Sequence, residues 1–288
     1  MNGAAAKLGP GARAALPFLA LLIVGFIAPL LTVIAFSFMP ARTFSIWQSP
    51  TFENYATIFE GSNYISFLWS LGLASITVLV LALVCYPVAY GLVRVFGRWS
   101  TALTLLFVIP LFVSENVRLY GWVLFLIKNG LLLGSLKTLF GVELESILFT
   151  QTAILIGMVY VYFPFMLFPM SLGIAMVPNE VREAAADLGA SRWQVFREVE
   201  LPLSMPGIII GFLLTFVLAV GAIAEAKVLG GQKVIPITHD IEIAFTYAQN
   251  WPLGAALAVL LMLVVGVLVL IVLRRFDLDA VLGRRRAS

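Results

Sequence analysis

The chain consists of long apolar runs separated by shorter polar segments. A helix needs about 20 mostly apolar residues to cross a bilayer. Six runs are candidates for spans, at about 15–38, 65–93, 101–117 (with a continuation to 127), 152–172, 206–223 and 253–273. Strands of a membrane barrel would instead show segments of about ten residues that alternate in polarity. The pattern therefore predicts an all-α, polytopic transmembrane helical bundle with about six spans.

Composition supports lipid as the main solvent of this chain. Hydrophobic residues make up 61% and charged residues 11% of the 288 residues, and the mean hydropathy is +1.04. A soluble domain carries about a quarter charged residues. The first run is also far longer than the apolar region of a signal peptide, which has about 7–15 residues. We expect it to be a retained first span.

The distribution of Lys and Arg predicts the orientation in the membrane, because cytoplasmic loops carry the excess of these residues. An internal N-terminus places twelve of the 18 Lys and Arg residues in cytoplasmic segments and six outside. Six spans then return the C-terminus to the cytoplasm. The expected organisation is a cytoplasmic tail over 1–14, a transmembrane domain over 15–273 and a cytoplasmic tail over 274–288.

The segment between the fourth and fifth predicted spans is unusually rich in charges, and it reads VPNEVREAAADLGASRWQVFREVELPLSMPG over residues 177–207. Asn179 is a candidate N-cap for a first short helix. Glu183 and Asp187 stand four residues apart, so they share one face of that helix. Gly189 suits the left-handed position that ends a helix.

A second short helix is predicted to begin directly after this glycine. Ser191 and Gln194 have the spacing of a capping box, and Pro202 is expected to close the unit. The segment therefore predicts a helix–turn–helix at the cytoplasmic membrane surface. Periodicity alone favours an ordinary amphipathic interfacial helix pair, because helical spacing specifies no partner.

The same segment resembles the EAA loop of ABC importer permeases. Glu183-Ala184-Ala185, then Gly189, Val199 and Leu201-Pro202 stand at the spacing of that motif, with Val in the usual Ile place. The resemblance implies a type I ABC importer permease fold and a docking site for a partner ATPase. The implied docking residues are Glu183, Ala184, Ala185, Asp187, Gly189, Leu201 and Pro202.

Further segments resemble the permeases of spermidine/putrescine importers, especially the first of their two permeases. These segments are YPVAYGL at 86–92, VIPLFVSENVRLYGW at 108–122, GMVYVYFPFMLFPM at 157–170, PLSMPGIIIG at 202–211, VLGG at 228–231 and WPLGAA at 251–256. Residues 222–227 and 234–242 depart from that pattern. The resemblance implies inward transport of a polyamine or another small nitrogenous solute by alternating access.

The resemblance also implies the partners and the location. The expected partners are an ABC ATPase dimer that binds ATP and Mg, a second permease subunit, an external solute-binding protein and membrane lipid, with no nucleic acid. The expected location is the bacterial inner membrane. This chain itself is expected to bind no cofactor.

Charged and aromatic residues next to the third and fifth spans are candidates for the solute pathway. Glu115 and Arg118 stand three residues apart, and Trp122 follows one turn later; Glu225 lies just beyond the fifth span. Charged groups near bilayer depth usually face the bundle interior or water. These residues are therefore predicted either to line the outer pathway or to form a structural charge pair at the outer interface.

Several other functions find little support in the sequence. One Cys and one His provide neither a disulfide nor a cluster of metal ligands. The chain lacks the G-x-x-x-x-G-K-[ST] phosphate loop, so ATP hydrolysis is expected in partner subunits. The alternative function is a secondary transporter or a channel not coupled to ATP; a secondary transporter would need ionisable groups near the middle of spans, where almost none occur. A membrane-embedded enzyme would need convergent polar groups within the spans, and few are visible. The EAA resemblance disfavours a non-transporting receptor or scaffold subunit.

Overall fold

A computed structural model describes residues 10–141, 145–231 and 233–275 of the chain. Every regular element within these ranges is helical, so the all-α prediction is confirmed. Six stretches are long and apolar enough to span a membrane: Pro17–Ser37, Asn63–Val95, Glu115–Phe140, Gln151–Ala175, Arg192–Val220 and Trp251–Arg275. We refer to them as spans one to six. Residues 1–9 and 276–288 of the two expected tails lie outside the described residues.

The described residues divide into two compact units, which are treated separately. The first unit runs to Tyr64 and resumes from Asp240 to Leu263. It contains α1 (Pro10–Leu22), η1 (Ile23–Ile27), α2 (Ala28–Ser37), α3 (Glu53–Glu60), most of α13 (Ile237–Thr246) and the first half of α14 (Trp251–Arg275). The Trp251 ring contacts the rings of Phe36, Phe44 and Phe245. An aromatic cluster therefore holds the start of α14 in this unit.

The second unit covers Ile65–His239 and the end of α14. It follows the chain through α4 (Asn63–Tyr90), η2 (Gly91–Val95), η3 (Gly97–Trp99), α5 (Ser100–Val108), η4 (Ile109–Phe112), α6 (Glu115–Leu126) and α7 (Leu131–Phe140). It continues with α8 (Gln151–Ala175), α9 (Asn179–Asp187), α10 (Arg192–Gln194), η5 (Val195–Glu200), α11 (Leu201–Val220) and α12 (Ala224–Val228).

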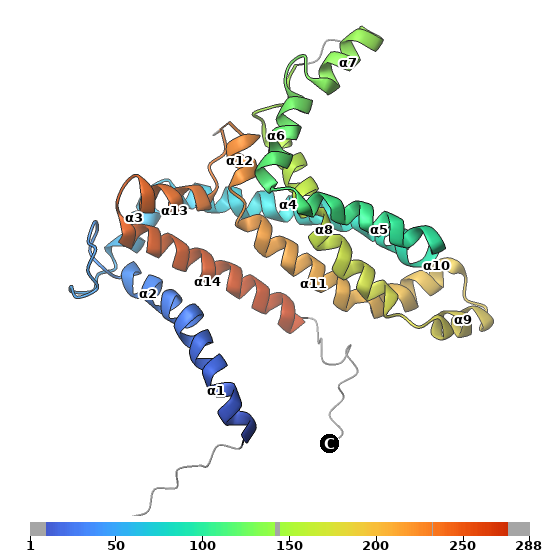
Figure 1. The fold of residues 1–288 in the computed structure, drawn as a ribbon, viewed down its shortest axis with the longest axis horizontal. Coiled ribbons are helices and arrows are strands. Elements are labelled where there is room, and N and C mark those ends of the chain that lie inside the picture. Colours follow the sequence, from blue (N-terminus) through green and yellow to red (C-terminus); the bar gives the residue numbers. More distant parts are fainter. Residues whose placement is uncertain (1–9, 142–144, 232, 276–288) are drawn as a thin grey trace, which may run out of the picture. The chain divides into compact units, whose positions relative to one another are not determined.

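The packing of α8 against α11 forms the core of the second unit (Figure 1). Small residues allow the two helix backbones to approach closely. A Cβ atom built on Gly173 would lie 2.8 Å from the Gly207 Cα, and one built on Gly207 would lie 2.5 Å from the Gly173 Cα. Spans four and five are therefore joined by a glycine-to-glycine crossing, which we call the Gly173–Gly207 crossing.

The apolar run predicted over 101–117 is interrupted in the structure. Helix η4 ends at Phe112, and Val113 is extended, with φ −101° and ψ 135°. The Ser114 hydroxyl then accepts a hydrogen bond from the Val117 amide and caps α6. The third span accordingly begins at Glu115, and the apolar helix over Gly97–Phe112 is shorter than a span. Hydropathy did not predict this break, because apolar residues occur on both sides of Val113.

Candidate coupling site and pathway residues

The predicted helix–turn–helix is present between spans four and five. Helix α9 ends at Asp187, and Gly189 has a left-handed φ of +88°. The Gly189 amide donates to the Ala186 carbonyl at 2.9 Å, and the Ala190 amide donates to the Ala185 carbonyl at 3.1 Å. These bonds satisfy carbonyls that a helix end leaves free. The predicted role of Gly189 as the helix stop is confirmed.

The capping box that starts the second helix is also confirmed. The Ser191 amide donates to the Gln194 Oε1 at 2.8 Å, and the Gln194 amide donates to the Ser191 Oγ at 3.3 Å. The cap fixes the direction in which the chain leaves the turn. Trp193 and Phe196 then stack on the second helix, with ring centroids 5.1 Å apart.

Two details of the predicted unit are wrong. Pro178, not Asn179, is the N-cap of α9, and it makes no side-chain cap. The Asn179 Oδ1 instead accepts from the Nη1 atoms of Arg94 and Arg182. Pro202 does not close the unit, because the helix continues through it from Arg192 to Val220.

The residues expected to dock the ATPase lie mostly on the surface of the second unit. Glu183, Ala184, Asp187, Gly189 and Pro202 are exposed, and Ala185 and Leu201 are half-buried. Helix α9 has no buried residue. Leu188, which sequence reasoning missed, is 89% exposed. Trp193 is also exposed, so this surface carries apolar as well as acidic side chains.

The candidate pathway residues on α6 and α12 come together with α8. Glu225 on α12 is fully buried, and neither of its carboxylate oxygens has a hydrogen-bond partner. Arg118 on α6 likewise has two buried nitrogens, Nε and Nη1, without a hydrogen-bond partner. Burial raises the pKa of the Glu225 carboxyl to about 7; the Glu115 carboxylate also raises this pKa, and Arg118 lowers it. Glu115, Arg118 and Glu225 therefore form one electrostatic cluster.

Trp122 lies one turn beyond Arg118 on an aromatic wall. Its ring contacts Tyr160 of α8 at 5.6 Å between centroids, and the Arg118 guanidinium lies 5.8 Å from the Tyr160 ring centroid. Trp122 and Tyr160 also line an apolar cavity of about 530 Å³ between α4, α5, α6 and α8. Sequence reasoning selected Trp122 but missed Tyr160. It also missed Tyr162 of α8, whose hydroxyl lowers the pKa of the Glu225 carboxyl.

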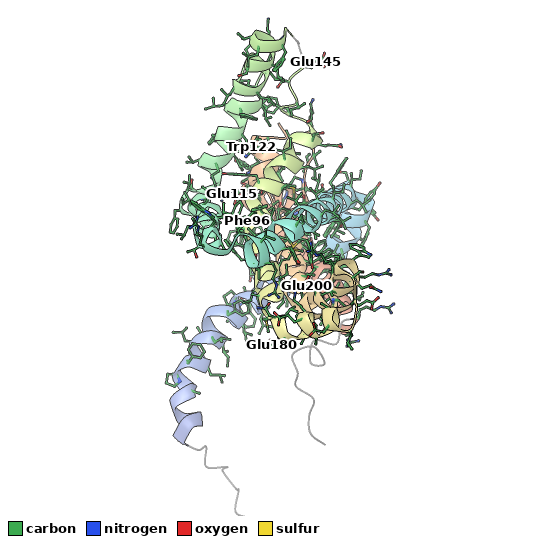
Figure 2. All side chains as sticks on the ribbon, turned by 90° about the vertical axis from the view of Figure 1, so that its right-hand side faces the viewer. Phe96, Glu115, Trp122, Glu145, Glu180 and Glu200 are labelled. Atoms are coloured by element: carbon green, nitrogen blue, oxygen red, sulfur yellow. The ribbon has the colours of Figure 1, made fainter. Side chains whose placement is uncertain are left out.

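The helix–turn–helix over 179–200, which we call the coupling unit after its expected role, and the cluster of Glu115, Arg118 and Glu225 lie in different parts of the second unit. Figure 2 shows Glu115 and Trp122 along α6, well away from Glu180 and Glu200. Within the described ranges, no three His, Cys, Asp or Glu side chains are grouped so that they could hold a metal ion. The two regions differ in exposure, because most residues of the coupling unit are exposed, whereas Glu225 is buried and Glu115 and Arg118 are half-buried.

Comparison with known proteins identifies the family. Residues 4–279 match the model of the binding-protein-dependent transport system inner membrane component. The chain belongs to this family. It is 34% identical over 256 residues to the spermidine/putrescine transport system permease protein PotB of Haemophilus influenzae, across 88% of this chain and 89% of that protein. It is 32% identical to PotB of Escherichia coli K12, across 87% of this chain and 92% of that protein.

Solved structures support the same fold. A bacterial ABC transporter involved in the import of the acidic polysaccharide alginate matches with a TM-score of 0.71, at 17% identity, over 96% of this chain and 95% of that chain. The alginate ABC transporter in complex with its alginate pentasaccharide-bound periplasmic protein matches with a TM-score of 0.69, at 18% identity, over 90% and 91%. This chain is therefore an ABC importer permease, a multi-pass inner-membrane transport subunit.

Proposed function

We propose that this permease moves a polyamine or another small nitrogenous solute inward, and that a partner ATPase dimer drives its alternating access. The observation that carries the proposal is α9, an unburied helix with Glu183 and Asp187 on one face, held between spans four and five. The spermidine/putrescine function of the PotB relatives supports the class of solute.

The proposed assembly has two ATPase subunits, which bind ATP and Mg, on the cytoplasmic side. A second permease subunit completes the pathway, and an external binding protein delivers the solute. This arrangement places both termini of the chain in the cytoplasm, as the distribution of Lys and Arg indicates. In this assembly ATP is hydrolysed by the partner subunits, and this chain contributes docking residues and half of the pathway.

Uptake by the reconstituted complex tests the proposal. Proteoliposomes should hold this permease, its partner permease and the ATPase, with the binding protein outside and ATP inside. We expect uptake of labelled spermidine or putrescine only when ATP, Mg and the binding protein are all present. Uptake that follows an imposed ion gradient without ATP would instead indicate a secondary transporter, and ATP-independent equilibration would indicate a channel.

The buried cluster around Glu225 is proposed to line the pathway. Glu115→Gln and Glu225→Gln each remove one negative charge at nearly constant volume. We expect each variant to lower uptake of a cationic solute by about tenfold, because each removes a negative charge that attracts the solute; tenfold corresponds to about 1.4 kcal/mol of binding free energy. Normal uptake kinetics in both variants would exclude these carboxylates from the pathway.

The acidity of Glu225 gives this experiment a second readout. With a pKa of about 7, the carboxyl is mostly neutral below that pH and becomes charged above it. The ratio of wild-type to Glu225→Gln uptake should therefore rise between about pH 6 and pH 8. The comparison at each pH uses the same ATPase and binding protein, so their own pH dependence cancels in the ratio.

A further inference from the structure

Helix α9 is not held in place by apolar packing. None of its residues is buried. A cavity of about 490 Å³ lies between α9 and the start of span five, and its lining includes Arg182, Glu183 and Glu200. A helix of nine residues is marginal in water without tertiary support. Polar contacts of Asn179 and Arg182, in the first half of α9, are therefore expected to contribute much to its position.

Arg94 provides most of these polar contacts. It lies in η2, at the end of span two. Its Nη2 donates to the carbonyls of Ile174 at 2.9 Å and Val177 at 2.7 Å, where span four ends, and its Nη1 donates to the Asn179 Oδ1 at 2.7 Å, in the first turn of α9. A cation is favourable at a helix C-terminus. One side chain thus joins span two, span four and α9.

Glu200 adds span five to this junction. Its carboxylate is almost completely buried, with 3% of the side chain exposed. The Oε1 atom pairs with the Nε of Arg94 at 3.6 Å and with the Nε of Arg182 on α9. These are ion pairs without hydrogen-bond geometry, because the three atoms have no hydrogen-bond partner. A buried carboxylate is stable only when it is paired, so Glu200 depends on both arginines.

The helices are irregular at the two charged residues that belong to spans. Arg94 lies in the π-helical segment Gly91–Val95, and Glu200 ends the π-helical segment Val195–Glu200. Short π-helical segments inside α-helices occur often at functional sites. Here both segments stand where a span meets the coupling unit, and each one carries one partner of the ion pair.

We propose that Arg94 and Glu200 form a charged joint that transmits movement of α9 to spans two, four and five. The inference rests on the proposed function, because α9 is the helix expected to follow the ATPase. In this account Arg94 and Glu200 are positioning residues: they contact neither solute nor nucleotide, and they set how far a displacement of α9 reaches the spans. Apolar contacts around the cavity between α9 and span five would transmit a displacement of α9 to the spans poorly.

The ratio of solute imported to ATP hydrolysed tests the joint in the reconstituted complex. Glu200→Gln keeps the shape of the side chain and removes the charge that pairs with both arginines. We expect solute imported per ATP to fall at least about fivefold, in complexes that assemble with normal stoichiometry. Arg94→Gln should lower the same ratio, whereas Arg94→Lys, which retains one charge, should recover part of it.

Matched controls separate the joint from general effects of charge. Glu198→Gln matches Glu200→Gln on an exposed residue of η5, and Arg98→Gln matches Arg94→Gln on an exposed residue just after span two. Both controls should leave the ratio of solute imported to ATP hydrolysed unchanged. An unchanged ratio in Glu200→Gln would overturn the proposal. So would an equal loss of uptake and hydrolysis, since that outcome indicates a merely structural role. If Glu200→Gln fails to assemble, Glu200→Asp and Arg182→Gln provide the same measurement with smaller changes.

Failure of the proposed function is recognised separately. It would appear as wild-type complexes that import nothing in response to ATP. In that case the joint is tested by the mobility of a spin label at exposed Leu188, which follows α9. Glu200→Gln should increase this mobility and Glu198→Gln should not. Equal mobility in the two variants would overturn the proposal as well.

Discussion

Replacing Glu183 by Arg should almost abolish solute uptake while leaving the permease in the membrane. Glu183 is exposed on α9 and shares a face with Asp187, so the substitution reverses half of the charge that this face offers to the ATPase. Disrupting one partner of a charge pair in an interface costs about 2–5 kcal/mol. We expect uptake to fall at least about tenfold, with unchanged amounts of permease in purified membranes.

Gly189→Asp tests the same surface by a different physical route. The glycine has a φ of +88°, a conformation that side-chain-bearing residues rarely adopt, but a Cβ atom there would meet nothing within 4 Å. The change therefore strains the turn between the two helices without a clash in the core.

Glu198→Arg, a charge reversal on an exposed residue of η5, is the control for Glu183→Arg and should keep full uptake. Full uptake by Glu183→Arg would show that the acidic face of α9 does not dock the ATPase.

Much of the fold follows from hydropathy, because lipid thickness sets the length of a span. The apolar run over 152–172 predicted α8 within three residues at each end, and the run over 253–273 predicted α14 within two. The break at Val113–Ser114 could not be predicted in this way. It depends on backbone geometry and a local cap, and neither alters the average hydropathy of the run.

The parts of the coupling unit that depend on hydrogen bonds between residues close in sequence were predictable. Gly189, Ser191 and Gln194 act on backbone atoms within a few residues of themselves, so their roles could be predicted from spacing. Glu200 gave no such signal, because its burial depends on Arg94 and Arg182, which are distant in sequence or on another helix. In a segment dense with charges, the sequence alone does not distinguish the buried Glu200 from the exposed Glu198 two residues before it.

The Gly173–Gly207 crossing should be the position in the second unit where one methyl group does most damage. A Cβ on residue 207 would lie 2.5 Å from the Gly173 Cα and 2.7 Å from the Gly173 amide nitrogen. Both are backbone atoms, so no side chain can move aside, and α8 and α11 must separate. Overpacking of this kind costs about 1–3 kcal/mol. We expect Gly207→Ala to lower the thermal unfolding midpoint of the purified permease by several degrees.

A glycine elsewhere in the unit isolates the effect of the crossing from that of helix propensity. Gly72 lies within α4, and a Cβ atom there would meet nothing within 4 Å. Ala is a better helix former than Gly by about 0.5–1 kcal/mol, so Gly72→Ala should raise the midpoint slightly. Gly173→Ala should act like Gly207→Ala, and the double variant should cost less than the sum, because the same two helices separate only once. Additive losses, or a Gly207→Ala midpoint equal to wild type, would mean that the two spans do not cross at these glycines.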